Sequence, residues 1–159
     1  MKEFDFLKLF EKDEKSQFLI EKINNNSNTK SSILLQNIQG SLKTILAASI
    51  FKKTNFNHLF ILENLEDSLY FLDDLNNLDA NINGLLFPSS ERISVGDNNV
   101  ILERIETLNQ INSKKKTCVI TYPKAVKEKI LNKKEFKKKK IEIQVGDKFD
   151  IEDFIETLY

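Results

Sequence analysis

The sequence predicts an α/β fold in which a parallel sheet carries helices on both faces. Short apolar runs alternate with amphipathic helical stretches through most of the 159 residues, as parallel strands joined by helical crossovers require. The segment 34–51 gives the clearest unit: an apolar strand, a tight turn at Gly40 and an alanine-rich helix. The other predicted helices and strands precede or follow this unit in the sequence.

Composition narrows the class of protein. The chain has single-domain length, with 40% hydrophobic and 30% charged residues, which is typical of a globular domain. Its formal net charge is zero, so overall charge predicts no partner. One cysteine excludes an internal disulfide framework and a multi-cysteine metal site. With a single histidine, we expect neither a zinc site nor a catalytic triad. No apolar run reaches membrane-spanning length and the first residues do not resemble a secretory signal, so we expect a cytoplasmic protein without a membrane partner.

The first third of the chain contains two leading helices and the first strand. Residues 1–23 place apolar side chains at helical spacing, which predicts two short helices. Residues 24–32 form a polar loop. Residues 33–38 are predicted as the first strand, and the helix after Gly40 follows it.

Two further strands and two further helices are predicted in the middle of the chain. Residues 59–62 form the second strand, and Asn64 is the N-cap of the next helix. Residues 85–87 form a third strand, which Pro88 ends. The apolar spacing predicts that the helix after Asn64 buries Leu65, Leu69, Leu72 and Leu75. It also predicts a helix after residue 99 that buries Ile101, Ile105 and Leu108.

The last third contains two more predicted strands. Residues 117–121 form the fourth and include Cys118 as a buried side chain. Pro123 suits the first position of the following helix, with Val126 and Ile130 on its inner face. Residues 141–145 alternate apolar and polar, as in a half-exposed fifth strand, and Asp150 caps a last helix.

The turn at Gly40 partly matches the phosphate-binding P-loop, G-x-x-x-x-G-K-[ST]. Lys43 and Thr44 occupy the last two positions, but Asn37 and Leu42 stand where the pattern requires glycine. Glycines let the backbone amides approach the phosphates closely. We therefore expect a strand–helix turn that has kept the shape of a P-loop and lost its function, without cofactor or metal. The alternative is an independent P-loop ATPase using Lys43 and Thr44.

Lysines are concentrated between residues 114 and 140. This excess of positive charge could bind phosphates of DNA, but the chain has only two arginines, and a solvated surface explains the same pattern. A lysine-rich DNA-binding domain is thus a second alternative. The possible phosphate or DNA patch consists of Lys114, Lys115, Lys116, Lys133, Lys134, Lys137, Lys138, Lys139 and Lys140.

The order of motifs resembles the N-terminal, UvrB-like region of the bacterial transcription-repair coupling factor. The matching pieces cover nearly everything after residue 33. In order they are LLQNIQGSLKTILAASIF, LFILENLEDSLYFLDDL, LLFPSS, NNVILERIETLNQI, VITYPKAV and VGDKFDIEDFIETLY. UvrB itself carries a functional P-loop and a tyrosine-rich hairpin before the PSS-like stretch. This chain has neither, so the resemblance favours the coupling factor.

The resemblance implies a non-catalytic module of an ATP-driven DNA translocase that displaces stalled RNA polymerase and recruits excision repair through UvrA. It implies leading helices and a loop over 1–32, and a degenerate P-loop domain, a RecA-like half-domain, over 33–140. It also implies the truncated start of a second domain over 141–159. ATP and Mg²⁺ would belong to motor domains outside these residues. UvrA and RNA polymerase would be partners of the full-length protein, and this segment would pack on the rest of the parent chain.

Overall fold

The computed structural model describes residues 6–25, 30–90, 99–113, 115–130, 132, 134–135 and 146. The chain divides into two compact units, Met1–Glu128 and Lys129–Tyr159. In the second unit, Asn132 Oδ1 accepts hydrogen bonds from the backbone N–H groups of Lys134 and Glu135 at 3.1 and 3.0 Å. The predicted strand over 141–145 and the predicted last helix lie outside the described residues. Every described strand belongs to the first unit.

A parallel sheet forms the centre of the first unit. Its strands are β1 (His58–Ile61), β2 (Leu85–Leu86) and β3 (Cys118–Thr121), in the spatial order β1-β3-β2. His58 lies opposite Cys118, and Leu85 lies opposite Val119. Every residue of the central strand β3 is buried. The predicted parallel α/β class is therefore confirmed, with a sheet of three strands in the described part of the chain.

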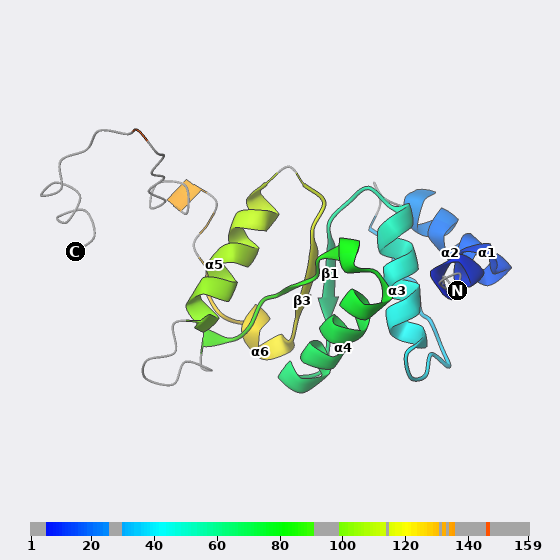
Figure 1. Cartoon of the computed structure of the whole chain (residues 1–159), viewed down its shortest axis with the longest axis horizontal. Coiled ribbons are helices and arrows are strands. Elements are labelled where there is room, and N and C mark those ends of the chain that lie inside the picture. The colour runs from blue at the N-terminus through cyan, green and yellow to red at the C-terminus, as the bar shows by residue number, and fades with distance from the viewer. Residues whose placement is uncertain are drawn as a thin grey trace, which may run out of the picture. The chain divides into compact units, whose positions relative to one another are not determined.

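Helices cover both faces of this sheet, as predicted (Figure 1). On one face lie α3 (Leu42–Lys53) and α4 (Leu65–Leu78), and on the other lie α5 (Asn99–Asn112) and α6 (Pro123–Val126). The core beneath α3 and α4 includes Ala47, Ala48, Phe51, Phe71, Leu75, Cys118 and Ile120. The core beneath α5 and α6 includes Phe87, Val119, Tyr122 and Ala125.

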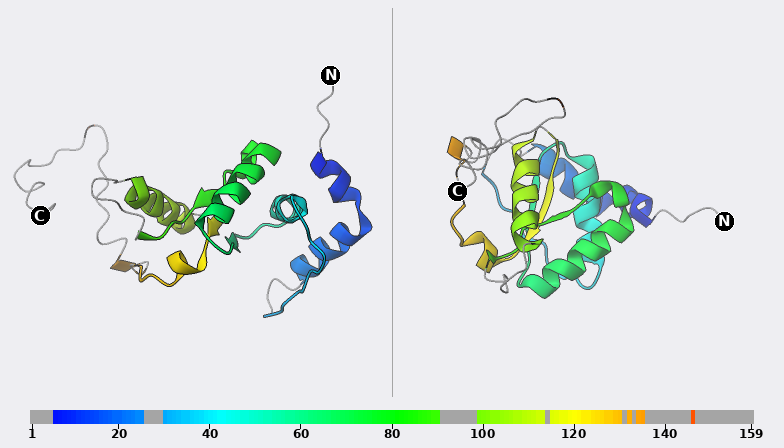
Figure 2. Two further views of the ribbon diagram at one scale, coloured as in Figure 1. Left: turned by 90° about the horizontal axis from the view of Figure 1, so that it is seen from below. Right: turned by 60° about the vertical axis from the view of Figure 1, so that its left-hand side comes forward.

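The two predicted leading helices are present as α1 (Phe6–Lys12) and α2 (Glu14–Asn25). Both pack on α3 (Figure 2), and Leu7 of α1 joins the core beneath α3 and α4. The carboxylate of Asp13 begins α2 by accepting hydrogen bonds from the backbone N–H and the hydroxyl of Ser16 at 2.9 and 3.1 Å. Asp13 thus acts as an N-cap that fixes the angle between the two helices.

Individual residues determine where several other helices and strands begin. Asn64 Oδ1 accepts the backbone N–H of Asp67 at 2.9 Å, and Pro123 occupies the first turn of α6; both predictions are confirmed. After α4, the 3₁₀ helix η1 (Ala80–Ile82) leads into β2. A Cβ atom on Gly84 would lie 2.7 Å from Leu72 Cδ1 and 3.0 Å from Ile120 Cδ1. Glycine therefore permits the close approach of this backbone to α4 and β3.

The prediction that residues 33–38 form the first strand is wrong. These residues have no regular secondary structure and pair with no described strand. Asn37 has a φ of 61°, in the left-handed region that interrupts an extended backbone. Leu34 keeps 82% of its surface exposed. In the arrangement seen here, the run lies between α2, α3 and the end of β1 without pairing with a strand.

Some predicted buried positions in three helices are also wrong, although Leu75 of α4 is buried and Leu65 and Leu72 pack against the two cores. Leu69 of α4, Ile101 and Ile105 of α5, and Val126 of α6 are exposed. Ile130, predicted on the inner face of the last of these helices, lies beyond its end and is also exposed. The small or polar residues Ser68, Thr107 and Ala125 are buried in their place. Apolar spacing alone therefore does not identify every buried position, because small and polar residues also occupy the buried faces of these helices.

Candidate functional site

The residues of the predicted degenerate P-loop lie at the turn before α3, which includes Gly40, and in the first turn of α3, which begins at Leu42. Gly40 has a φ of +55°, and Leu42 N–H donates to Gln39 O at 3.3 Å, which closes the turn. Ser41 precedes the helix without a side-chain cap hydrogen bond. The turn predicted from the sequence is therefore present, but no strand leads into it among the described residues.

The three P-loop side chains in the first turn of α3 point in different directions. Leu42 lines a groove beside α2, and Lys43 lines a smaller groove beside β1. Thr44 is fully buried, and its hydroxyl has no hydrogen-bond partner among the described residues. In a working P-loop the lysine and the hydroxyl converge with the backbone amides on one anion. The structure does not bring Lys43 and Thr44 together in that way.

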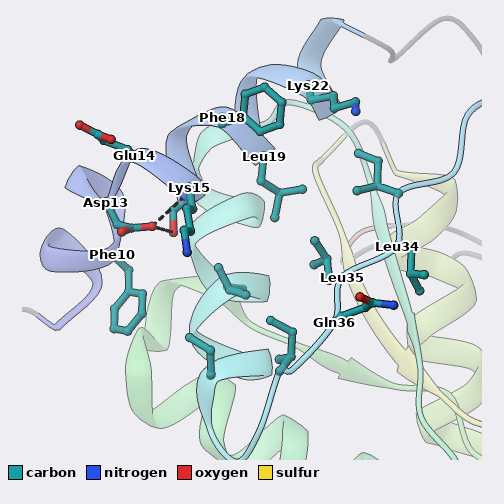
Figure 3. Close-up of a pocket in the computed structure, with 15 residues that line it drawn as sticks. Phe10, Asp13, Glu14, Lys15, Phe18, Leu19, Lys22, Leu34, Leu35 and Gln36 are labelled. Atoms are coloured by element: carbon teal, nitrogen blue, oxygen red, sulfur yellow. Dashed lines mark hydrogen bonds between the residues drawn. The ribbon is translucent and has the colours of Figure 1, made fainter.

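The larger groove, which we call the α2 groove, has a volume of about 650 Å³. Phe18 and Leu19 of α2 form one side, and Leu34 and Leu35 form the opposite side (Figure 3). Lys22 Nζ lies 5.7 Å from the centre of the Phe18 ring. The remaining lining residues are Phe10, Asp13, Glu14, Lys15, Ser16, Ile33, Gln36, Ile38, Leu42 and Leu46. This mainly apolar groove has charged side chains along α2 and suits a ligand with an apolar surface.

A smaller apolar groove of about 260 Å³, which we call the β1 groove, lies along the end of β1. Leu35 and Ile38 form part of its lining, as do Phe60 and Ile61. The other lining residues are Lys43, Leu46, Ala47, Ile50, Leu62 and Phe71. Residues 33–38 thus contribute side chains to both grooves.

A polar network centred on Glu128 lies beyond the carboxyl ends of β2 and β3, where open α/β sheets commonly bind ligands. Glu128 Oε1 accepts the Ser89 hydroxyl at 2.6 Å and the Ser90 N–H at 2.9 Å. Its Oε2 atom lies 3.0 Å from Arg104 Nη1. The Arg104 guanidinium also donates to Pro88 O and lies 4.3 Å from the centre of the Phe87 ring.

The surroundings of Glu128 favour its charged form. Burial alone would raise the pKa of Glu128, but hydrogen bonds from Ser89 and Ser90 and the charge of Arg104 outweigh burial and lower it from 4.5. Tyr122 Oη accepts the Ser89 N–H at 2.8 Å. Sequence reasoning missed this network, because Ser89 and Glu128 are 39 residues apart and no motif joins them. The polar groups here bind one another and hold the segment after β2.

An aromatic cluster surrounds the only histidine. His58 stacks on Phe56 with ring centres 5.0 Å apart and is hydrogen-bonded to Thr54 Oγ1 at 2.6 Å. Burial, together with the nearby charge of Lys116, lowers the pKa of His58 to about 4. His58 is therefore neutral at neutral pH. The unfolded chain binds the proton more readily between about pH 6.5 and 4, so this residue makes stability fall as pH falls through that range.

The predicted lysine patch is only partly described. Lys115 and Lys134 are exposed, whereas Lys116 turns inward: its Nζ lies 3.9 Å from the centre of the Phe51 ring and donates to Phe51 O. Burial lowers the pKa of Lys116. Lys114, Lys133 and the run 137–140 lie outside the described residues. Lys116 thus stabilises the end of α3 and is not directed toward solvent as a phosphate contact would be.

The described residues do not meet the requirements of a metal site or of a reactive thiol. No group of three or more histidine, cysteine, aspartate or glutamate side chains there could hold a metal ion. Cys118 is buried, and burial raises the pKa of its thiol to about 12 against the opposing effect of Lys116, which leaves the thiol unreactive. No helix among the described residues is long and apolar enough to cross a membrane.

The described residues form a parallel α/β fold that carries the α2 groove, the β1 groove and an internally bonded polar network at the carboxyl ends of β2 and β3. No protein-family model, curated protein or solved structure matches the chain. Evidence for its function therefore comes from its sequence and structure alone.

Proposed function

We propose that this chain is a non-catalytic scaffold module with a RecA-like half-domain, like the first UvrB-like domain of a transcription-repair coupling factor. Its partners would be the rest of a DNA translocase and, through that protein, UvrA and RNA polymerase. ATP and Mg²⁺ would act in the motor domains of the parent and not in this segment. The ordered set of motifs from residue 34 onward supports the family, and the parallel α/β fold is compatible with it.

One observation carries the non-catalytic part of the proposal. At the carboxyl ends of the strands, polar side chains bond to protein groups: Thr121 Oγ1 donates to Phe87 O at 2.8 Å, and Ser68 Oγ donates to Thr121 O at 3.2 Å. The Glu128 network extends this pattern beyond β2. A catalytic site of this fold class needs such groups directed at a substrate. Polar side chains that are hydrogen-bonded to neighbouring loops are better suited to a rigid scaffold than to catalysis.

The first test is nucleotide binding. We expect equilibrium dialysis of the full chain against Mg²⁺-ATP to give no saturable binding up to millimolar concentrations, because Leu42 and Asn37 prevent the close backbone approach that phosphates require. The double variant Asn37→Gly/Leu42→Gly should be needed before any binding is seen. Saturable binding by the native chain that Lys43→Ala abolishes would instead establish the alternative, an independent P-loop ATPase.

The second test addresses the repair role. Disrupting the gene in its host should slow removal of ultraviolet lesions from the transcribed strand of an active gene to the rate of the other strand. Complementation with the native gene and with a gene carrying Lys43→Ala should restore faster repair of the transcribed strand equally well. Lys43 has no catalytic role in this proposal. Unchanged repair of both strands after disruption would refute the assignment to a coupling factor.

A further inference from the structure

The outer edge of β1 has unused hydrogen-bonding capacity. His58 N–H donates to Thr117 O and Leu62 N–H donates to Thr121 O, each at 2.9 Å. Because alternate residues of a parallel strand face the same neighbour, the backbone groups of Leu59 and Ile61 point away from β3. No strand of the described part of the chain lies on that side. The side chains of Leu59 and Ile61 are 58% and 53% exposed, so this edge lacks the charges that usually protect one.

The topology specifies which segment belongs at this edge. The connection from β1 through α4 to β2 passes over β3, and α3 lies on the same face of the sheet as α4. Crossover connections between parallel strands are almost always right-handed. A strand that precedes α3 must therefore lie on the far side of β1 from β3. Residues 33–38 immediately precede α3 in the chain.

These residues already border the vacant edge. Leu35 and Ile38 line the β1 groove together with Phe60 and Ile61, and a short turn at residues 39–41 joins them to α3. We propose that residues 33–38 exchange between the arrangement seen here and a docked one, in which they form a fourth parallel strand along the outer edge of β1. Docking fills the β1 groove and gives hydrogen-bond partners to Leu59 and Ile61.

Docking also changes the α2 groove. Five of its lining residues, Ile33, Leu34, Leu35, Gln36 and Ile38, belong to this segment. Moving them to β1 removes one wall of the groove. A ligand that requires both walls therefore binds only the undocked arrangement and shifts the population toward it. The exchange of residues 33–38 therefore couples the outer edge of β1 to the α2 groove. This coupling does not depend on the proposed function.

Asn37 controls the exchange. Its φ of 61° is left-handed, whereas a docked strand needs an extended backbone at this position. Asparagine tolerates both conformations, glycine favours the left-handed one more strongly, and β-branched residues strongly disfavour it. Residue 37 is exposed, so substitution there does not disturb the core. Asn37→Val should therefore favour docking, and Asn37→Gly should favour the arrangement seen here.

Amide hydrogen exchange of the full chain tests this inference. We expect the Leu59 and Ile61 amides to exchange about tenfold more slowly in Asn37→Val than in Asn37→Gly, because only docking protects them. The Phe60 amide faces β3 and should be protected equally in both variants, which also reports that the sheet is intact. Asn37→Thr repeats the test with a second β-branched residue. Equal exchange at Leu59 and Ile61 in all three variants, with Phe60 still protected, would overturn the proposal.

Discussion

Replacing Ile120 with alanine is expected to lower the free energy of unfolding by about 3–4 kcal/mol. Ile120 lies on the central strand and is 0% exposed, within the core that α3 and α4 cover. Truncation removes apolar contacts to both helices and leaves a cavity that the surrounding strands cannot fill. Urea unfolding followed by circular dichroism measures the change, provided that the slope against denaturant stays constant.

Two variants control this measurement. Ile120→Val removes one methyl group and should cost about 1 kcal/mol. Leu102→Ala truncates a side chain of α5 that is 61% exposed and should change stability by less than about 0.5 kcal/mol. An Ile120→Ala variant as stable as Leu102→Ala would mean that the centre of the sheet lies elsewhere in the chain.

Elements set by neighbouring residues could be predicted from the sequence. The run 117–121 is apolar or β-branched throughout and forms the buried β3. Asn64 and Pro123 begin helices for reasons contained within one turn of the chain, a side-chain cap in one case and a fixed φ in the other. Strands alternating with such helices also predicted the parallel α/β class. Each of these inferences needs only local information.

Features that depend on distant residues could not be predicted. Residues 33–38 have strand-like composition, but whether they pair depends on the edge of β1, which the sequence does not place. Ile101 and Ile105 have helical spacing, yet Val100 and Thr107 are the residues of α5 that are buried. Thr107 suits its buried position because its hydroxyl donates to Leu86 O at 2.9 Å. The turn at Gly40 was predicted correctly, whereas the Glu128 network joins residues with no shared motif.

Removing the carboxylate of Glu128 is expected to have the second-largest effect. Glu128→Ala should lower the free energy of unfolding by about 2–3 kcal/mol, because it leaves the Arg104 guanidinium and the buried Ser89 hydroxyl without their shared acceptor. The Arg104 and Glu128 side chains are 13% and 20% exposed, so water replaces part of the lost interaction. Glu106→Ala, at an exposed position of α5, should change stability by less than about 0.5 kcal/mol.

The pH dependence separates the charge of Glu128 from its packing. Because its folded-state pKa is lowered from 4.5, its charge stabilises the fold above about pH 4.5, and this contribution is lost as pH falls through the folded-state pKa. Urea unfolding should therefore show the wild type more stable than Glu128→Gln at pH 7, with the difference shrinking below pH 4.5. The titration of His58 between about pH 6.5 and 4 occurs in both proteins and cancels. A difference that stays constant down to pH 3 would mean that the Arg104–Glu128 ion pair adds no stability.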